Sequence, residues 1–214
     1  MPLVKRLVFT LAAFVALGLS GATTARADIV VSSGVNNQGT DNVLLNTATN
    51  VNTVTGTVNS GAFGVNFVSA SGNLSAEASG QAVITAGSTN DPFTNISFSG
   101  ADGFTFTRAV FNLNTAYSGN VTITVTGFNI DGGVFSQQYS VGANGENFFT
   151  VDAINGQLIS GISLTAVGAG NEFEDLRQVR IGGAAAAVPE PTTMLLLGTG
   201  LAGIAARARR RRKA

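Results

Sequence analysis

The 214-residue sequence contains no cysteine, no histidine and no tryptophan. Without histidine or cysteine the chain can form no Ser-His-Asp triad, no Cys-His dyad, no zinc site built on imidazole or thiolate, and no disulfide. The lack of disulfides is compatible with export, because a domain of this size can bury a sufficient core without cross-links. Any catalysis would depend on carboxylates, on serine with another base, or on a hard metal ion.

Basic residues are scarce in the middle of the chain. Between residues 28 and 187 there are three arginines (Arg108, Arg177 and Arg180), no lysine, and eleven of the twelve acidic residues. Nucleic-acid binding relies on Lys and Arg that neutralise phosphates. We therefore expect no nucleic-acid partner, and we do not assign that role to the basic run at the C-terminus.

The N-terminal apolar run is too short for a permanent membrane span. Residues 1–27 begin with Lys5 and Arg6, continue with apolar residues 7–19, and end in Ala25-Arg26-Ala27. A basic start, a short apolar core and an A-x-A ending are typical of a secretory signal peptide. We predict cleavage by signal peptidase after Ala27, so that the exported chain begins at Asp28. A permanent N-terminal helix is the alternative, but a span needs about 20 apolar residues.

The C-terminal region has three parts: Pro189-Glu190-Pro191, an uncharged stretch over residues 191–206, and a basic cluster over residues 207–213. As a helix the uncharged stretch would be about 24 Å long, shorter than the ~30 Å hydrocarbon core of a bilayer. We predict a short transmembrane helix that holds the chain transiently in the inner membrane, with its arginines on the cytoplasmic side.

Three glycines in this stretch, Gly198, Gly200 and Gly203, have the spacing G-x-G-x-x-G. A dinucleotide-binding turn also needs a second strand and an acidic residue about 20 positions further on, and the printed sequence has neither after Gly203. Small residues at these spacings let membrane helices approach closely. We therefore expect contact with a membrane partner.

The C-terminal pattern resembles the PEP-CTERM sorting signal of Gram-negative bacteria. V-P-E-P-T matches its signature, residues 194–206 its helix, and the arginine cluster its basic tail. The resemblance implies recognition and C-terminal processing by exosortase, a membrane-embedded relative of cysteine protease-transpeptidases, in bacteria that make exopolysaccharide and biofilm. The prolines keep the recognition segment extended, as a protease requires. The implied sorting and processing residues are Val188, Pro189, Glu190, Pro191, Thr192, Arg207, Arg209, Arg210, Arg211 and Arg212.

The body of the chain alternates apolar and polar residues with the period of a half-buried strand. In residues 119–128, for example, Val121, Ile123 and Val125 alternate with threonines. Glycine, asparagine and aspartate separate such segments, so we predict an all-β, jelly-roll-like antiparallel β-sandwich of eight to ten strands. A β-solenoid is the alternative, although no fixed repeat period occurs. Expected strands cover residues 28–33, 50–59, 62–71, 74–86, 102–114, 119–128, 134–141, 147–153, 158–167 and 176–181.

Two further expectations concern the phenylalanines. The alternation changes phase between Phe106 and Phe111, which predicts a bulge or bend near Arg108. Most of the large aromatic rings are expected to fill the core of the sandwich. They are Phe63, Phe67, Phe104, Phe106, Phe111, Phe128, Phe148 and Phe149.

The densest acidic group, Glu172, Glu174 and Asp175, has two interpretations. These carboxylates are weak candidates for a Ca²⁺ site, because calcium prefers oxygen ligands, or they pair with Arg177 and Arg180 in a structural network. We identify no catalytic residues and no cofactor other than this candidate calcium. The usual aromatic platform for sugars is nearly absent, with only two tyrosines, Tyr117 and Tyr139, to stack on one.

These observations predict four segments: a signal peptide (1–27), a β-sandwich domain (28–183), a linker (184–188) and a sorting signal (189–214). The expected function is that of an exported, non-catalytic protein of the cell surface or extracellular matrix, sorted by exosortase and associated with exopolysaccharide. The alternative is a small glycan-active enzyme or a calcium-dependent glycan-binding module acting on the matrix.

Overall fold

The computed structural model describes residues 29–61, 63–78, 83–128, 133–143 and 145–184. The predicted signal peptide, with Ala25, Ala27 and Asp28, and the sorting signal from Val188 onward lie outside these residues. So does the predicted C-terminal helix. Within the described ranges, no helix has the length and apolar character needed to cross a membrane.

The described residues form fourteen strands and one short 3₁₀ turn, η1 (Ala101–Gly103). Alternating burial runs through most of them, for example in β4, where Val54, Gly56 and Val58 are buried and the threonines between them are exposed. The strands are β1 (Ile29–Ser33), β2 (Thr40–Leu45), β3 (Ala48–Val51), β4 (Thr53–Val58), β5 (Gly64–Val68), β6 (Leu74–Glu77), β7 (Val83–Ala86), β8 (Asn95–Gly100), β9 (Arg108–Thr115), β10 (Gly119–Phe128), β11 (Val134–Val141), β12 (Asn147–Ala153), β13 (Leu158–Val167) and β14 (Phe173–Gly182).

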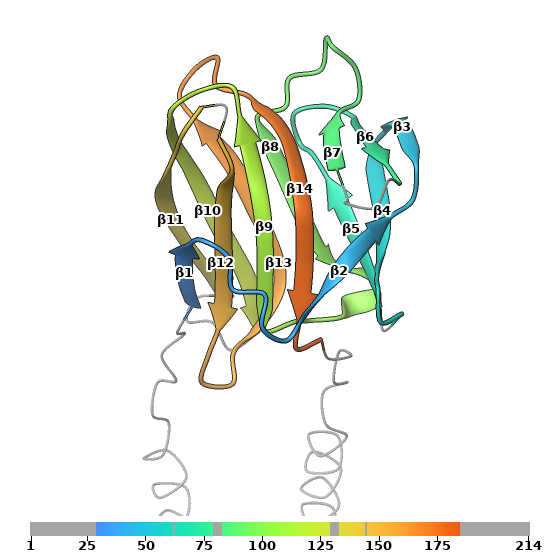
Figure 1. Ribbon diagram of the computed structural model, residues 1–214, viewed down its shortest axis with the longest axis vertical. Helices are drawn as coiled ribbons and strands as arrows, with labels where there is room; N and C mark the ends of the chain where they lie inside the picture. Colours follow the sequence, from blue (N-terminus) through green and yellow to red (C-terminus); the bar gives the residue numbers. More distant parts are fainter. Residues whose placement is uncertain (1–28, 62, 79–82, 129–132, 144, 185–214) are drawn as a thin grey trace, which may run out of the picture.

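The strands make two layers, which we call sheet A and sheet B (Figure 1). Sheet A has the order β1-β12-β9-β14. Residues 176–177 of β14 also pair with β7, which pairs with β6, which in turn pairs with β3. Sheet B has the order β2-β4-β5-β8-β13-β10-β11. Strand β2 joins the layers, because residues 40–42 pair with β14 and residues 43–45 pair with β4.

The all-β antiparallel sandwich predicted from the sequence is confirmed, but the expected number of eight to ten strands was too low, since the described residues form fourteen. Every strand pair is antiparallel, and the connection through β2 gives a nearly closed, barrel-like arrangement. Strands distant in sequence lie side by side, such as β1 with β12 and β2 with β14. A solenoid stacks successive repeats on their neighbours, so these long-range pairings exclude it.

Aromatic rings from both sheets meet in the centre of the sandwich. Phe98 on β8 lies 5.7 Å from Phe111 on β9, ring centre to ring centre, in an edge-to-face arrangement. Phe111 also lies 5.7 Å from Phe149 on β12. Of the predicted core phenylalanines, five are buried (Phe63, Phe67, Phe106, Phe111 and Phe149), Phe104 and Phe148 are half-buried, and the side chain of Phe128 lies outside the described part.

The change of phase near Arg108 marks the passage of the chain from one sheet to the other. Phe106 exchanges backbone hydrogen bonds with Ile159 on β13 of sheet B, at 3.0 and 2.8 Å. The next residue, Thr107, donates its backbone N–H to Gly182 on β14 of sheet A, at 3.0 Å. The predicted bend is therefore present, and its cause is the crossing between layers.

Candidate functional site

The three acidic residues suggested as metal ligands lie at the start of β14. Glu172 is exposed just before the strand, Glu174 is exposed within it, and Asp175 is buried. The register of β14 against β9 shifts between Phe173 and Asp175, so the alternation of faces is interrupted here. Glu172 thus lies outside β14, whereas Glu174 and Asp175 lie within it.

Arg177 binds one of these three carboxylates, that of Asp175. Its Nε donates to Asp175 Oδ1 at 2.6 Å, and its Nη2 donates a second, shorter bond to Asp175 Oδ2. Hydrogen bonding to Asp175 raises the pKa of Arg177, and the charges of Asp175, Glu146 and Glu174 act in the same direction, against desolvation. Asn114 Nδ2 donates to Glu174 Oε2 at 2.6 Å and to Asp175 Oδ2 at 3.3 Å.

This geometry agrees with the interpretation that Asp175 pairs with Arg177 in a structural network. Arg180 has a different partner: its Nε donates to Thr40 Oγ1 at 3.2 Å. Among the described residues, no group of three or more His, Cys, Asp or Glu is arranged to hold a metal ion. The chemistry available at this end of β14 is therefore a carboxylate held by a guanidinium.

We predict that Asp175→Asn lowers the free energy of unfolding by about 1–2 kcal/mol, because the amide cannot accept both charged hydrogen bonds of Arg177. Glu172→Gln, the matched exposed control, should change it by less than about 0.5 kcal/mol. Urea denaturation of the purified protein measures both. A rise in melting temperature with calcium that Asp175→Asn abolishes would contradict the structural role and favour a metal site.

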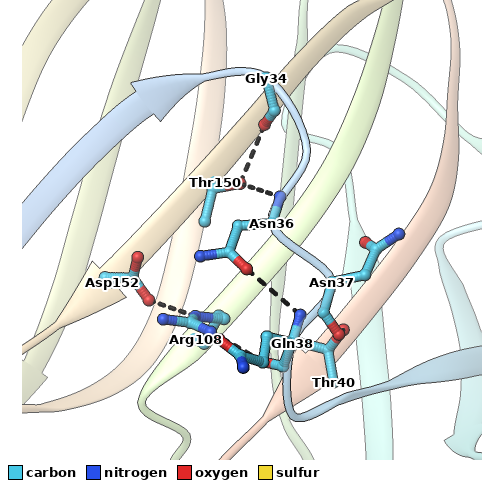
Figure 2. A network of polar contacts seen from close by, with 8 residues as sticks. All are labelled: Gly34, Asn36, Asn37, Gln38, Thr40, Arg108, Thr150 and Asp152. Atoms are coloured by element: carbon cyan, nitrogen blue, oxygen red, sulfur yellow. Dashed lines mark hydrogen bonds and ion pairs between the residues drawn. The ribbon is translucent and has the colours of Figure 1, made fainter.

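A second polar network fixes the segment of residues 34–39, here called the strap, which connects β1 to β2 across the outer side of sheet A. Figure 2 shows Thr150 on β12 bonded to it twice: Thr150 Oγ1 donates to the Gly34 carbonyl at 2.9 Å and accepts from the Asn36 N–H at 3.1 Å. Arg108 pairs with Asp152 and donates from Nη1 to the Gln38 carbonyl at 2.7 Å. All three body arginines therefore bond to groups within the fold.

Asn112 on β9 is a polar residue that the sequence did not single out. It is fully buried, and neither its amide nitrogen nor its amide oxygen has a hydrogen-bond partner. Its cross-strand neighbours on the same face are Phe148 on β12 and Arg177 on β14. Burying an amide group without hydrogen-bond partners lowers the free energy of unfolding, because the loss of its hydration is not compensated.

The outward side of sheet B, here called the hydroxyl face, has a different character. The strands β4, β5, β8, β10, β11 and β13 contain no charged residue. Outward-facing hydroxyls line up across neighbouring strands, as in the row Ser136, Thr124, Ser163 and Ser97. Thr124 and Ser136 are bonded at 3.0 Å, and Asn95 Nδ2 donates to Ser163 Oγ at 3.2 Å and to Thr165 Oγ1 at 2.9 Å.

Neither tyrosine stands on an open face as a stacking platform. Tyr117 is half-buried, packs against the hydrophobic core and donates its hydroxyl to the Asn120 carbonyl at 3.2 Å. Tyr139, on the inward side of β11, meets Phe149 edge-to-face at 5.9 Å. Burial raises the pKa of both phenols. Both rings therefore contribute to packing at the margin of the core.

Comparison with protein families identifies one segment. Residues 187–211 match the PEP-CTERM protein-sorting motif. The resemblance drawn from V-P-E-P-T, the short apolar stretch and the arginine cluster is therefore confirmed, and the chain carries this motif at its C-terminus. No curated protein matches the chain.

Comparison with solved structures gives carbohydrate-binding modules. A family 29 module from Piromyces equi is similar at a TM-score of 0.34 and 12% identity, over 73% of this chain and 91% of that one. A variant of the module CBM29-2 gives a TM-score of 0.31 at 16% identity, over 77% and 99%. A third family 29 module gives 0.23 at 16% identity, over 74% and 87%. All three TM-scores lie below 0.5.

Proposed function

We propose that this chain is an exported, non-catalytic protein of the cell envelope or extracellular matrix, processed at both ends. Signal peptidase removes residues 1–27, the sandwich domain spans 28–183, residues 184–188 form a linker, and exosortase acts on the sorting signal at 189–214. The observation that carries this proposal is the PEP-CTERM motif at residues 187–211. An extended Pro-Glu-Pro segment between a folded domain and a short membrane helix is accessible to a membrane-embedded protease.

The composition and contacts of the body support a role without turnover. The chain has neither histidine nor cysteine. Of the carboxylates that sequence analysis singled out, Asp175 is paired with Arg177, and Arg108 and Asp152 pair beside the strap. The excess of acidic residues and the hydroxyl face keep the surface hydrated among polysaccharide chains. We infer that the domain is retained in an exopolysaccharide matrix once the membrane helix has been removed.

Processing is expected to leave a chain that begins at Asp28 and lacks the arginine cluster. Intact-mass measurement of the protein from its native host tests this directly. In a strain without exosortase the C-terminal segment should remain and the protein should fractionate with the inner membrane. The double variant Pro189→Ala/Pro191→Ala should have the same effect in the parent strain, because it removes the extended recognition segment.

The matched control is Ala186→Ser in the linker, which should be processed like the parent. Intact arginine clusters on most of the protein in cells that carry exosortase would overturn the sorting proposal. Incubation of the purified protein with extracellular polysaccharides tests the non-catalytic part separately. Release of shorter glycans would overturn that part and favour the glycan-active alternative.

A further inference from the structure

Strand β11 is an open sheet edge without the usual protection. It pairs with β10 over eight residues in continuous register and has no strand partner on its other side among the described residues. Half of its backbone N–H and C=O groups therefore face outward from the sheet. Natural edges are protected by charges, prolines, bulges or shortness, and β11, with the sequence VFSQQYSV, has none of these.

The free edges β1 and β3 are shorter than β11. Edge strand β1 has five residues, and β3 has four. Pairing of β3 with β6 shifts register between Ala48 and Val51, where Asn50 has a left-handed φ of 53°. An irregular, short edge cannot continue a ladder. Strand β11 is thus the longer regular edge among the described strands and has the most backbone groups available to a further strand.

We propose that β11 pairs with β11 of a second copy of this chain, antiparallel and centred on Gln137. Residues opposite each other in an antiparallel pair share a face, and pairing with β10 puts Phe135, Gln137 and Tyr139 on the inward side. Twofold pairing at Gln137 then places Phe135 of each copy opposite Tyr139 of the other. Cross-strand aromatic pairs of this kind stabilise sheets, and both rings are half-buried at the margin of the core.

Charge restricts the surface at which a second copy can bind. The body has eleven acidic residues against three arginines, so two copies repel each other over most of their surface. Strand β11 contains no charged residue, so pairing it with β11 of a second copy brings no charged side chains of the two strands opposite each other. The pairing does not depend on processing by exosortase.

The absence of native cysteine makes a sharp test available. In the proposed register residue 137 faces residue 137 of the second copy, at a Cα separation of about 4.5–5.5 Å, which a disulfide can bridge. Residue 138 faces residue 136, so two copies of residue 138 are about 7–8 Å apart and cannot be bridged. Full-length Gln137→Cys should form a disulfide dimer under mild oxidation, seen on non-reducing gels, and Gln138→Cys should not.

Two controls complete the experiment. Thr53→Cys, exposed on β4, should stay monomeric on the gel, and thermal melts of all cysteine variants should match the parent. Adding Ser136→Lys to Gln137→Cys should lower the dimer yield at least tenfold, whereas Thr53→Lys on the same background should not. Association through the hydrophobic tail would not distinguish positions 137 and 138. The proposal would be overturned if positions 137 and 138 cross-linked equally, if only position 138 did so, or if neither did. Cross-linking of Gln137→Cys to another protein would overturn it as well.

Discussion

Phe111→Ala is expected to lower the free energy of unfolding by about 3–5 kcal/mol, the range found for large aromatic truncations in cores. Phe111 is fully buried on β9 of sheet A and meets Phe98 of sheet B and Phe149 of its own sheet, each at 5.7 Å. Its removal would leave a cavity between the layers and end two aromatic contacts at once. Guanidinium denaturation followed by circular dichroism measures the change.

Phe111→Leu provides the control for that experiment. Leucine keeps most of the apolar volume, so we expect a loss of no more than about 1.5 kcal/mol. Both variants remove the aromatic ring, so they differ mainly in the size of the cavity, and comparing them isolates the contribution of that cavity. A loss of less than about 1 kcal/mol for Phe111→Ala would mean that the two sheets are not held together at this cluster.

The second large effect is expected at Gly100, the last residue of β8. A Cβ atom at this position would lie 2.2 Å from the carbonyl oxygen of Phe104, across η1. That oxygen belongs to the backbone, so the turn itself would have to move. We predict that Gly100→Ala lowers the free energy of unfolding by about 3 kcal/mol, the upper part of the usual range for overpacking. It should also displace the ring of Phe104, which stacks on Phe63 with 5.4 Å between the ring centres.

Gly161 on β13 is the matched control. A Cβ atom there would meet the Phe98 carbonyl oxygen at 3.4 Å and Ser99 Cβ at 3.5 Å, which are ordinary contacts, and its φ is not in the left-handed region. Gly161→Ala should therefore be neutral or stabilising, by up to about 1 kcal/mol, because alanine restricts the unfolded chain. Thermal melts of the two variants side by side check the prediction. Equal stability of both would contradict the close approach at Gly100.

The bounds of several strands could be predicted from the sequence because one face of each strand lies toward the core and the other does not. Residues 119–128, 134–141, 147–153 and 158–167 were expected as strands and are β10, β11, β12 and β13. Each alternates between a core face and an outward face, and the period of two is visible in the residues themselves. Strand β8 has the same signal, with Ile96 and Phe98 buried between polar neighbours, but was not predicted, although the pattern could have revealed it.

Other elements gave no comparable signal. Strand β2 was not expected, because it leaves one sheet for the other halfway along, so its burial follows neither sheet throughout. Residues 74–86 were expected as one strand and form two, β6 and β7, which pair with each other. At the start of β14, the expected strand began at residue 176, whereas the observed strand begins at Phe173 with a register shift.

The sequence by itself determined the properties that depend on residue type and local order. These are the class of fold, the exclusion of histidine and cysteine chemistry, the excess of acid in the body and the C-terminal sorting motif. Only the tertiary structure decided that Asp175 pairs with Arg177 while Arg180 bonds to Thr40, that Thr150 fixes the strap, and that β11 ends a sheet. Each of these depends on which strands lie side by side, and strand order is set by long-range packing that no local pattern encodes.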